Sequence, residues 1–467
     1  MNLSIGAVIL AAGEGKRLKL NAPKPLAPCL DKKLVDFPIK ELKKFFSQNK
    51  IEGKITAVIG HQREIVRKYI EKNYPDVSFA IQEEQLGTAD ALRSYFDNKD
   101  PSNVSKNFLY TLVICADTPA VSANELSEML SVLTKEKFDA LAASFLEKNP
   151  KGYGRIVRGK KGFHIVEEKD ASDEIRLTTE VNSGLYLLKT DYLVEHLKSI
   201  DSNNKSGEFY LTDVFKDGLN VAAHCFPDGQ IFLGVNTLKQ LEDVEKVLRK
   251  KIKMELQENG VRFIDSSHCY IDSEVEVGEG TIVYPNVFLT GKTKIGKDVV
   301  IEMGAQVKDS IVDDGAKVLA YSILEGARLH SLASAGPFAR LRPGADIGPE
   351  AKIGNFVEIK KSVLDRGVKV SHLSYVGDAF IGEETNIGCG FITCNFDGVN
   401  KHVTKIGKNS FIGSDSQTVA PVEIGDNCFV ASSSTITKDM PEGSFAISRG
   451  QQTTKIDLAK KFLKKKV

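Results

Sequence analysis

An aliphatic residue recurs at every sixth position through much of the second half of this chain. The clearest runs extend from Ile271 to Val307 and from Ile406 to Ile436. A period of six fits neither an α-helix nor a single strand, whose side chains repeat about every 3.6 and every 2 residues. It fits a chain that turns a corner after each short strand and points one aliphatic side chain per side into a prism. The sequence therefore predicts a parallel β-helix over residues 261–467.

The repeat is disturbed at two places. It drifts through residues 309–326 and resumes at Ile347, and it is broken at greater length by CNFDGVNKHVTK, residues 394–405. Glycine often follows the aliphatic position, as a tight corner requires. A loop that leaves a regular prism is a natural place for binding groups.

The first 236 residues have a different pattern, in which apolar runs alternate with amphipathic ones. This alternation predicts a Rossmann-like α/β domain with a largely parallel sheet, whose ligand crevice lies beyond the carboxyl ends of the strands. Strands are expected near residues 5–12, 55–60, 111–117, 139–146 and 182–188, and helices near residues 36–48, 64–72 and 123–135.

Residues 237–260 separate the two patterns. Apolar residues from Leu238 to Leu256 recur at spacings of three and four, which is typical of one stripe along a long helix. Asn259 and Gly260 supply a stop at its end. We expect a linker helix here.

Composition narrows the class of protein. A chain of 467 residues exceeds one ordinary hydrophobic core, and a formal net charge of +1 gives no global attraction to nucleic acid or a membrane. The 7 cysteines are scattered without a CxxC pair, which is typical of reduced cytosolic thiols. With no apolar segment of membrane-spanning length, we expect a cytoplasmic protein.

The basic tail after Thr454, ending in KKFLKKKV, fits either a solvated terminal helix or a nucleic-acid patch.

A glycine-rich, cationic segment follows the first apolar run. Gly13 and Gly15 would let backbone N–H groups approach a phosphate, and Arg17 and Lys24 add positive charge. The segment lacks the full pattern of a Walker A loop or a dinucleotide fingerprint. By itself it fits a phosphate cradle or a tight turn equally well.

Other polar residues follow the predicted strands of the first half. Gln82, Gln85, Gly87 and Thr88 precede a helical pattern and suit recognition of a base edge. Asp117 ends a buried strand, where a carboxylate either holds Mg²⁺ or makes a turn.

The prism carries a second candidate site. Arg342, Lys360, His372 and Tyr375 fall on its grid. Two cations near one neutral base suit a substrate that bears both a phosphate and an amine, because only the free amine attacks a thioester and an imidazole can remove its proton. The alternative is that His372 is an ordinary surface histidine.

Together and in this order, the motifs resemble those of two known families. The G-x-G-x-R…PK segment and EQLGTA are similar to the N-acetylglucosamine-1-phosphate uridylyltransferases among the sugar-1-phosphate nucleotidyltransferases. FARLRPGA, GNFVEIKK, ITCNFDGVNK, FIGSDSQ and AISR resemble hexapeptide-repeat acyltransferases, specifically the glucosamine-1-phosphate acetyltransferase half of the bifunctional bacterial enzymes that make UDP-N-acetylglucosamine. The resemblance extends from Ile5 to about Arg449.

The resemblance implies roles for residues of the first half. Arg17 and Lys24 neutralise charge while UTP loses pyrophosphate, and Asp117 and Asn236 hold Mg²⁺. The residues implied to bind the nucleotide are Leu10, Ala11, Ala12, Gly13, Lys24, Gln82, Gly87 and Thr88, and those implied to bind the amino sugar are Gly154, Glu167 and Asn182.

It also implies roles in the second half. His372 is the general base, Arg342 and Lys360 hold the sugar phosphate, and Tyr375 and Asn386 position the sugar. The residues implied to contact acetyl-coenzyme A are Cys389, Asn395, Phe396, Ser414, Ser432 and Arg449. Members of this family are homotrimers of left-handed β-helices with acetyl sites between chains, and their product feeds peptidoglycan and lipopolysaccharide synthesis.

Four positions depart from the family pattern. Cys115 and Ala116 stand where Tyr-Gly usually precedes the metal carboxylate, Lys16 replaces a Thr or Ser before Arg17, and Phe396 replaces a Tyr. We expect a bifunctional enzyme with domains at residues 1–236 and 261–467. The alternatives are a single-function nucleotidyltransferase with a regulatory or oligomerising β-helix, and a non-enzymatic assembly subunit.

Overall fold

A computed structural model of the protein describes residues 3–97, 107–160 and 162–463. The chain forms two compact units, residues 1–250 and 251–467. Of the helices in the described part of the chain, none combines the length and apolar composition that crossing a membrane requires.

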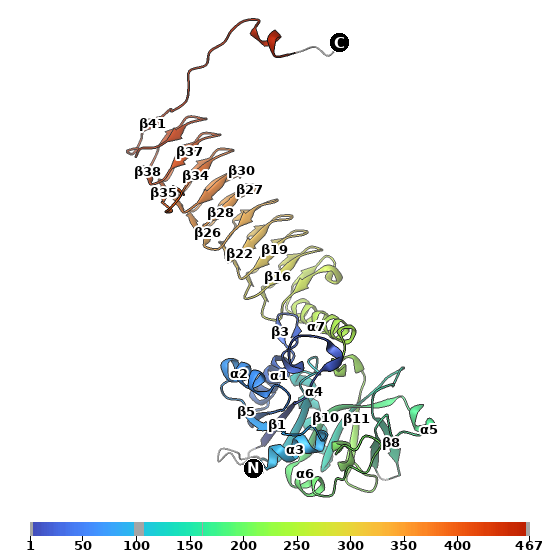
Figure 1. Ribbon diagram of the computed structural model, residues 1–467. Coiled ribbons are helices and arrows are strands. Elements are labelled where there is room, and N and C mark those ends of the chain that lie inside the picture. Colours follow the sequence, from blue (N-terminus) through green and yellow to red (C-terminus); the bar gives the residue numbers. More distant parts are fainter. Residues whose placement is uncertain (1–2, 98–106, 161, 464–467) are drawn as a thin grey trace. The chain divides into compact units, whose positions relative to one another are not determined.

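The first unit is built on one twisted sheet with the strand order β11-β7-β10-β6-β1-β4-β5 (Figure 1). Its strands are β1 (Ser4–Ala11), β4 (Glu52–Ile59), β5 (Ser78–Ile81), β6 (Tyr110–Cys115), β7 (Ala140–Leu146), β10 (Glu180–Lys189) and β11 (Val221–Phe226), and the hairpin of β8 (Arg155–Gly159) and β9 (Gly162–Val166) pairs with β10. Strand β10 runs antiparallel to β6 and β7, and the other neighbours along this order are parallel. The predicted α/β domain with a largely parallel sheet is confirmed.

Helices cover both faces of this sheet. One face packs against α1 (Asp36–Asn49), α2 (Arg63–Asn73) and α4 (Ala123–Glu136), and the other packs against α3 (Thr88–Phe96) and α6 (Thr190–Leu197). Successive residues of β1 alternate between the two cores: Ala7 and Ile9 face the first, and Val8 faces the second. Shorter elements are β2 (Pro28–Cys29), β3 (Lys32–Lys33), α5 (Asp173–Arg176) and the 3₁₀ turns η1 (Lys16–Leu18), η2 (Lys24–Leu26), η4 (Leu211–Val214) and η5 (Gly229–Phe232).

Helix α7 (Leu238–Glu258) occupies the segment expected to be the linker. Its apolar stripe divides between two cores. Leu241, Val244 and Leu248 pack inside the first unit, whereas Leu256 is part of the core of the second. Leu238 is exposed, because the stripe enters the core only one turn later.

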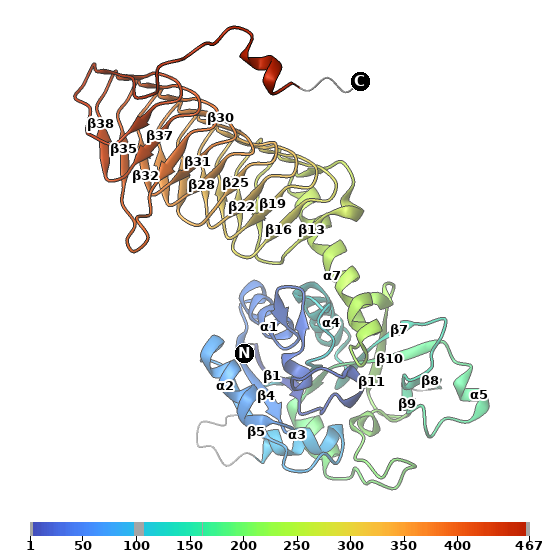
Figure 2. The ribbon, with the colours of Figure 1, turned by 45° about the horizontal axis from the view of Figure 1, so that its top comes forward.

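The second unit is a three-sided parallel β-helix whose coils stack along one axis (Figure 2). Face 1 contains β12 (Arg262–Phe263), β15 (Ile282–Val283), β18 (Val300–Ile301), β21 (Lys317–Val318), β24 (Ser334–Ala335), β27 (Lys352–Asn355), β30 (Lys369–His372), β33 (Asn386–Ile387), β36 (Phe411–Ile412), β39 (Phe429–Val430) and β41 (Phe445–Ala446). Face 2 contains β13 (Tyr270–Ile271), β16 (Phe288–Thr290), β19 (Gln306–Lys308), β22 (Ile323–Glu325), β25 (Arg340–Leu341), β28 (Glu358–Lys360), β31 (Tyr375–Gly377), β34 (Ile392–Cys394), β37 (Gln417–Val419) and β40 (Thr435–Ile436). Face 3 contains β14 (Glu276–Val277), β17 (Lys294–Ile295), β20 (Ile311–Val312), β23 (Arg328–Leu329), β26 (Ala345–Ile347), β29 (Ser362–Leu364), β32 (Ala379–Ile381), β35 (Thr404–Ile406) and β38 (Val422–Ile424).

The six-residue period arises because each aliphatic side chain stacks on its equivalent in the next coil. On face 1, for example, Val283 pairs with Ile301, and Ile301 pairs with Val318. The drift seen in the sequence has a simple cause: Val307 and Val312 are five residues apart, and so are Leu324 and Leu329, so two corners are each one residue shorter while the stack continues. The predicted β-helix is therefore confirmed, and its hexapeptide repeats fit the left-handed form that the resemblance implies. The chain then passes through the 3₁₀ turn η7 (Leu458–Lys461), and residues 464–467 of the basic tail lie outside the described residues.

Candidate functional sites

The first group of site residues lies where β1 ends. This strand delivers Leu10 and Ala11, and the chain then turns through Ala12 and Gly13. A pocket of about 280 Å³ opens there, lined by Leu10, Ala12, Gly13, Gln82, Gln85, Gly87, Thr88, Ala91 and Glu208. Open parallel sheets bind ligands beyond the carboxyl ends of their strands, so the pocket lies where a nucleotide is expected.

Hydrogen bonds fix the polar wall of this pocket. The buried Gln82 amide donates to the carbonyl oxygen of Gly87 at 3.0 Å and to Asp90 at 2.8 Å. The Gln85 amide donates to the carbonyl oxygen of Ala12 at 2.6 Å, which ties this wall to the end of β1. Gly87 has a φ of +122°, and a Cβ there would lie 2.5 Å from the carbonyl oxygen of Phe209. The turn before α3 therefore requires glycine.

Lys24 joins the two residues implied to hold a metal. Its ammonium makes an ion pair with Asp117 and donates to Oδ1 of Asn236 at 2.8 Å. Asp117 comes after β6 and Asn236 precedes α7, so three distant parts of the chain meet here. Gly15 allows the approach, because a Cβ at this position would lie 2.7 Å from Cβ of Lys24. A single ammonium therefore contacts both oxygens at once.

The donors fit Mg²⁺. A carboxylate and an amide oxygen are hard ligands, which Mg²⁺ prefers. Among the described residues no group of three or more His, Cys, Asp and Glu side chains could hold a metal. Proteins often bind Mg²⁺ through one or two carboxylates together with substrate phosphates. The pair therefore suits a metal that is bound together with a nucleotide.

Gly154, Glu167 and Asn182 form a row, in which Gly154 directly precedes β8, Glu167 directly follows β9 and Asn182 lies on β10. The Asn182 N–H donates to the carbonyl oxygen of Gly154 at 2.9 Å. A Cβ on Gly154 would lie 3.5 Å from Oε2 of Glu167 and 3.6 Å from Cβ of Asn182. Burial raises the pKa of Glu167, and the hydroxyl of Thr212, which donates to Oε1 at 3.1 Å, offsets this only in part. The structure thus brings the three residues implied to bind the sugar together.

The remaining residues of the first unit include two departures from the family pattern. Arg17 lies exposed on η1, and its neighbour Lys16 pairs with Glu14 at 2.8 Å. Burial raises the pKa of Cys115 to about 12, with Asp117 adding to the effect. The thiol is therefore a neutral neighbour of the predicted metal ligand.

His372 ends β30 at the corner between faces 1 and 2, and it is exposed. Its Nδ1 lies 2.7 Å from Oδ1 of Asn355, the residue paired with it on the preceding coil. An amide oxygen only accepts, so Nδ1–H donates and the lone pair remains on Nε2. The ring is therefore oriented as a base would need to be.

Cations gather on face 2. Arg342 and Lys360 occupy equivalent positions on successive coils, since Leu341 pairs with Ile359. The neighbouring ammonium of Lys401 lowers the pKa of Lys360, with a smaller effect from Arg342. Arg342 itself donates to Glu358 at 2.7 Å. Like charges held this close favour binding of an anion.

Tyr375 begins β31 on this same face, three residues after His372. Its phenol lies over Gly377, where any side chain would collide with it. The ring therefore crosses the face from the corner of His372 toward Lys360, which pairs with Gly377. Asn386 lies elsewhere, on β33 of face 1, where it pairs with Lys369. One chain thus brings Tyr375 and the cations together on face 2 and places Asn386 on a different face.

Four residues occupy equivalent positions on successive coils: His372, Cys389, Ser414 and Ser432. Each lies two residues after an aliphatic residue of the face 1 stack, in which Val370 pairs with Ile387, Ile387 with Ile412, and Ile412 with Val430. Arg449 reaches back to this column and donates to the carbonyl oxygen of Ser432 at 3.0 Å. With about 4.8 Å between strands, the column is long enough for an extended ligand.

The loop that interrupts the repeat carries Asn395 and Phe396. Asn395 is buried and donates to Asp378 at 2.5 Å, whereas Phe396 is exposed. Asp397 accepts from the N–H groups of Asn400 and Val399 and pairs with His402 at 2.7 Å, and these hydrogen bonds lower its pKa to about 2. These hydrogen bonds therefore hold the loop in one conformation. It also carries Lys401, which the sequence did not single out because the broken period hides where the loop returns.

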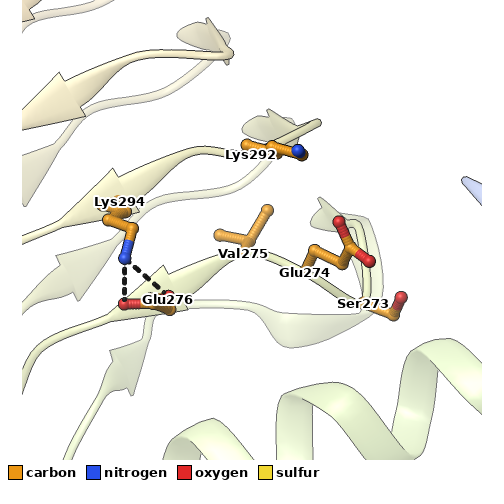
Figure 3. Close-up of a pocket in the computed structure, with 6 residues that line it drawn as sticks. All are labelled: Ser273, Glu274, Val275, Glu276, Lys292 and Lys294. Carbon is orange, nitrogen blue, oxygen red and sulfur yellow. Dashed lines mark hydrogen bonds and ion pairs between the residues drawn. The ribbon is translucent and has the colours of Figure 1, made fainter. Parts of the chain in front are cut away.

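A larger hollow, of about 440 Å³, lies on the first coils of the prism, whereas the predicted acetyl-transfer residues begin at Arg342. It is lined by Ser273, Glu274, Val275, Glu276, Lys292 and Lys294 (Figure 3). Its charges compensate one another, since Lys294 reaches both carboxylate oxygens of Glu276, at 2.9 and 3.1 Å. The hollow contains none of the predicted site residues.

Comparison with known proteins agrees with this division of the chain. Residues 6–233 match the family model described as nucleotidyl transferase, and residues 404–438 match the bacterial transferase hexapeptide model. Several curated relatives are named Bifunctional protein GlmU. The relative from Geotalea uraniireducens is 40% identical over 460 residues, which cover 97% of this chain and 98% of the relative. The relative from Thermosipho africanus is 41% identical over 446 residues, which cover 95% of each of the two chains. The relative from Clostridioides difficile is 37% identical over 462 residues, which cover 97% of each.

Proposed function

This chain belongs to the family of bifunctional GlmU proteins, and from that premise we propose that it makes UDP-N-acetylglucosamine in two steps. The first step transfers the acetyl group of acetyl-coenzyme A to the amine of glucosamine-1-phosphate. The second transfers the uridylyl group of UTP to N-acetylglucosamine-1-phosphate and releases pyrophosphate. The observation that carries the proposal is that each compact unit has its own chemical group: the Lys24–Asp117–Asn236 cluster in one, and His372 beside the cations of face 2 in the other.

Uridylyl transfer takes place at the end of β1. The phosphate oxygen of the sugar attacks the α-phosphorus of UTP, and the bond to the departing pyrophosphate breaks. This reaction needs positioning and charge neutralisation more than covalent help. Lys24 and Arg17 supply fixed positive charge, and the pocket containing Gln82, Gly87 and Thr88 holds the base. Asp117 and Asn236 would hold Mg²⁺, which neutralises charge on the phosphates when it is bound.

Acetyl transfer takes place on the prism. His372 removes a proton from the sugar ammonium through Nε2, because Nδ1 donates to Asn355. The free amine then attacks the thioester carbonyl and the carbon–sulfur bond breaks. As the amide forms, the nitrogen loses a proton and the departing sulfur gains one, so coenzyme A leaves as the free thiol. Arg342, Lys360 and Lys401 bind the phosphate of the sugar, and their mutual repulsion is relieved when the anion enters. Acetyl-coenzyme A lies along the column from Cys389 to Ser432, with Asn395, Phe396 and Arg449 beside it.

Three parts of the proposal concern the setting of the enzyme. It forms a homotrimer, in which Asn386 of one chain completes the acetyl site of another. It works in the cytoplasm and has no nucleic-acid or membrane partner. Its product supplies peptidoglycan and lipopolysaccharide synthesis.

The test is to give the purified full chain glucosamine-1-phosphate, acetyl-coenzyme A, UTP and Mg²⁺, and to follow free thiol and pyrophosphate separately. We expect thiol release without UTP, and pyrophosphate release only when acetyl-coenzyme A or N-acetylglucosamine-1-phosphate is also supplied. Absence of either product would contradict the proposal. Pyrophosphate release with no thiol release at any stage would favour a single-function nucleotidyltransferase.

A further inference from the structure

Arg155 is buried to an unusual degree for a charged residue. It lies on β8 with 1% of its surface exposed, directly after Gly154. Burying an arginine costs free energy unless its donors are paired, so such a residue needs partners that the surrounding fold supplies. Its partners lie immediately beside the row implied to bind the sugar.

The geometry of the hairpin places Arg155 one step from every member of that row. Arg155 pairs with Val166 on β9 and with Val181 on β10. The residues next to these three along the chain are Gly154, Glu167 and Asn182. Because side chains alternate along a strand, the guanidinium lies on the side of the hairpin opposite the row. The guanidinium therefore contacts the backbone and the residues next to the row, and it would not touch a bound sugar.

The guanidinium holds three segments at once. It donates to the carbonyl oxygens of Tyr153 and Arg176 and makes an ion pair with Glu168 at 2.7 Å. Tyr153 precedes Gly154, Glu168 follows Glu167, and Arg176 ends α5. A planar group with several donors in fixed directions can span three acceptors, whereas a lysine ammonium acts as a point charge.

We infer that Arg155 is a positioning residue for the sugar substrate of uridylyl transfer. From the opposite side of the hairpin, it holds the row of Gly154, Glu167 and Asn182 in place. The inference rests on the proposed function, because it adds a residue to that same site. Burial works against the charged form of Glu168, but the guanidinium of Arg155 in the ion pair and the backbone N–H of Gly152 outweigh it and lower the pKa of this carboxyl. The clamp is therefore ionic at neutral pH.

The test compares Arg155→Lys with a matched control, Arg158→Gln. Arg158 lies on the same strand and pairs with Glu180 through two hydrogen bonds of 2.8 and 2.6 Å, but it is exposed and lies beyond the row. We expect Arg155→Lys to raise the KM for N-acetylglucosamine-1-phosphate about tenfold while the KM for UTP changes little, and Arg158→Gln to leave both unchanged. Glu168→Gln, at a partly exposed position, should raise the same KM and serves if Arg155→Lys folds poorly.

A second readout does not depend on catalysis. Amide hydrogen exchange at Asn182, whose N–H donates to Gly154, should accelerate in Arg155→Lys and not in Arg158→Gln. Unchanged exchange, or an equal rise in both KM values, would overturn the inference. If the unsubstituted chain released no pyrophosphate, the proposed function would fail, while the exchange comparison would still decide whether Arg155 orders the row.

Discussion

At the scale of single residues, the surroundings of both proposed sites set the ionisation of their side chains. Burial raises the pKa of Glu167, the ammonium of Lys401 lowers that of Lys360, and hydrogen bonds lower that of Asp397 to about 2. Perturbed pKa values often gather at functional sites. These three groups lie beside the sugar row, in the cation group and in the loop of the prism, whereas other shifted groups, such as Asp265 with a pKa lowered to about 2, lie outside both proposed sites.

Glu167→Gln should weaken binding of the sugar and raise the stability of the fold at neutral pH. A carboxyl whose pKa is raised in the folded state costs stability once it ionises, so the wild-type penalty grows as pH rises above the ordinary value of 4.5 and is complete above the raised pKa. At pH 7 to 8 the variant should therefore unfold at a higher temperature than the wild type, and the difference should disappear below about pH 4. Thermal unfolding followed across this pH range checks the prediction.

Its neighbour provides a control of opposite sign. The pKa of Glu168 is lowered, so the carboxylate stabilises the fold above the ordinary value and this stability is lost as pH falls through the lowered pKa. Glu168→Gln should lower the unfolding temperature at pH 7. If Glu167→Gln and Glu168→Gln changed the unfolding temperature in the same direction at neutral pH, this account of the two carboxyls would be contradicted.

At the scale of elements, tight turns position the chemistry. The turn before α3 puts Gly87 at a φ of +122° against the backbone of Phe209, and the turn after β1 brings Gly15 against Lys24. In both cases the absence of a Cβ lets two segments come into contact, and Gly87 and Phe209 are distant in sequence. The pocket wall therefore depends on backbone conformation as much as on side chains.

Gly87→Ala should disrupt this wall. The new Cβ meets the carbonyl oxygen of Phe209 at 2.5 Å and adds backbone strain, for a cost of about 2–4 kcal/mol in the free energy of unfolding. Gly218→Ala is the matched control, because its φ is +92° and nothing lies within 4 Å of the new Cβ. The control should lose only about 1–2 kcal/mol from strain and should still bind UTP. Urea unfolding and calorimetric titration with UTP measure both effects, and equal losses in the two variants would refute the clash.

Most of the helices and strands could be predicted from the periodicity of the sequence. Buried strands such as β1 and β6 and the stacked coils of the prism follow from apolar patterns alone, because burial on two faces or in a prism demands them. The five-residue step from Val307 to Val312 could not be placed, since a shorter corner looks like a loss of the repeat. Lys401 and Arg155 were missed for a related reason: their roles depend on which distant segments meet them. The individual site assignments remain predictions.

At the scale of the whole molecule, each unit has its own core and its own proposed reaction. Within the second unit, Tyr375 and the cations share face 2 while Asn386 lies on face 1. A single chain therefore separates residues that are expected to touch one sugar. A trimer that brings face 1 of one chain to face 2 of the next would reunite them.

Subunit mixing tests this arrangement. Trimers of His372→Ala alone or Asn386→Ala alone should have little acetyl transfer. Trimers assembled from both chains should regain part of it, because a site that takes His372 from one chain and Asn386 from the other is intact. Co-expression with two affinity tags isolates the mixed trimers, and the assay is thiol release. Mixed trimers no more active than the separate variants would show that the two residues are not shared in this way.

The central claim is that two independent sites divide the work, and one paired assay tests it most directly. Thiol and pyrophosphate release are measured in parallel for the wild type, His372→Ala and Asp117→Ala, with N-acetylglucosamine-1-phosphate supplied for the second reaction. We predict that His372→Ala loses thiol release and keeps pyrophosphate release, and that Asp117→Ala does the reverse. If either variant lost both activities equally, or lost neither, the division would be contradicted.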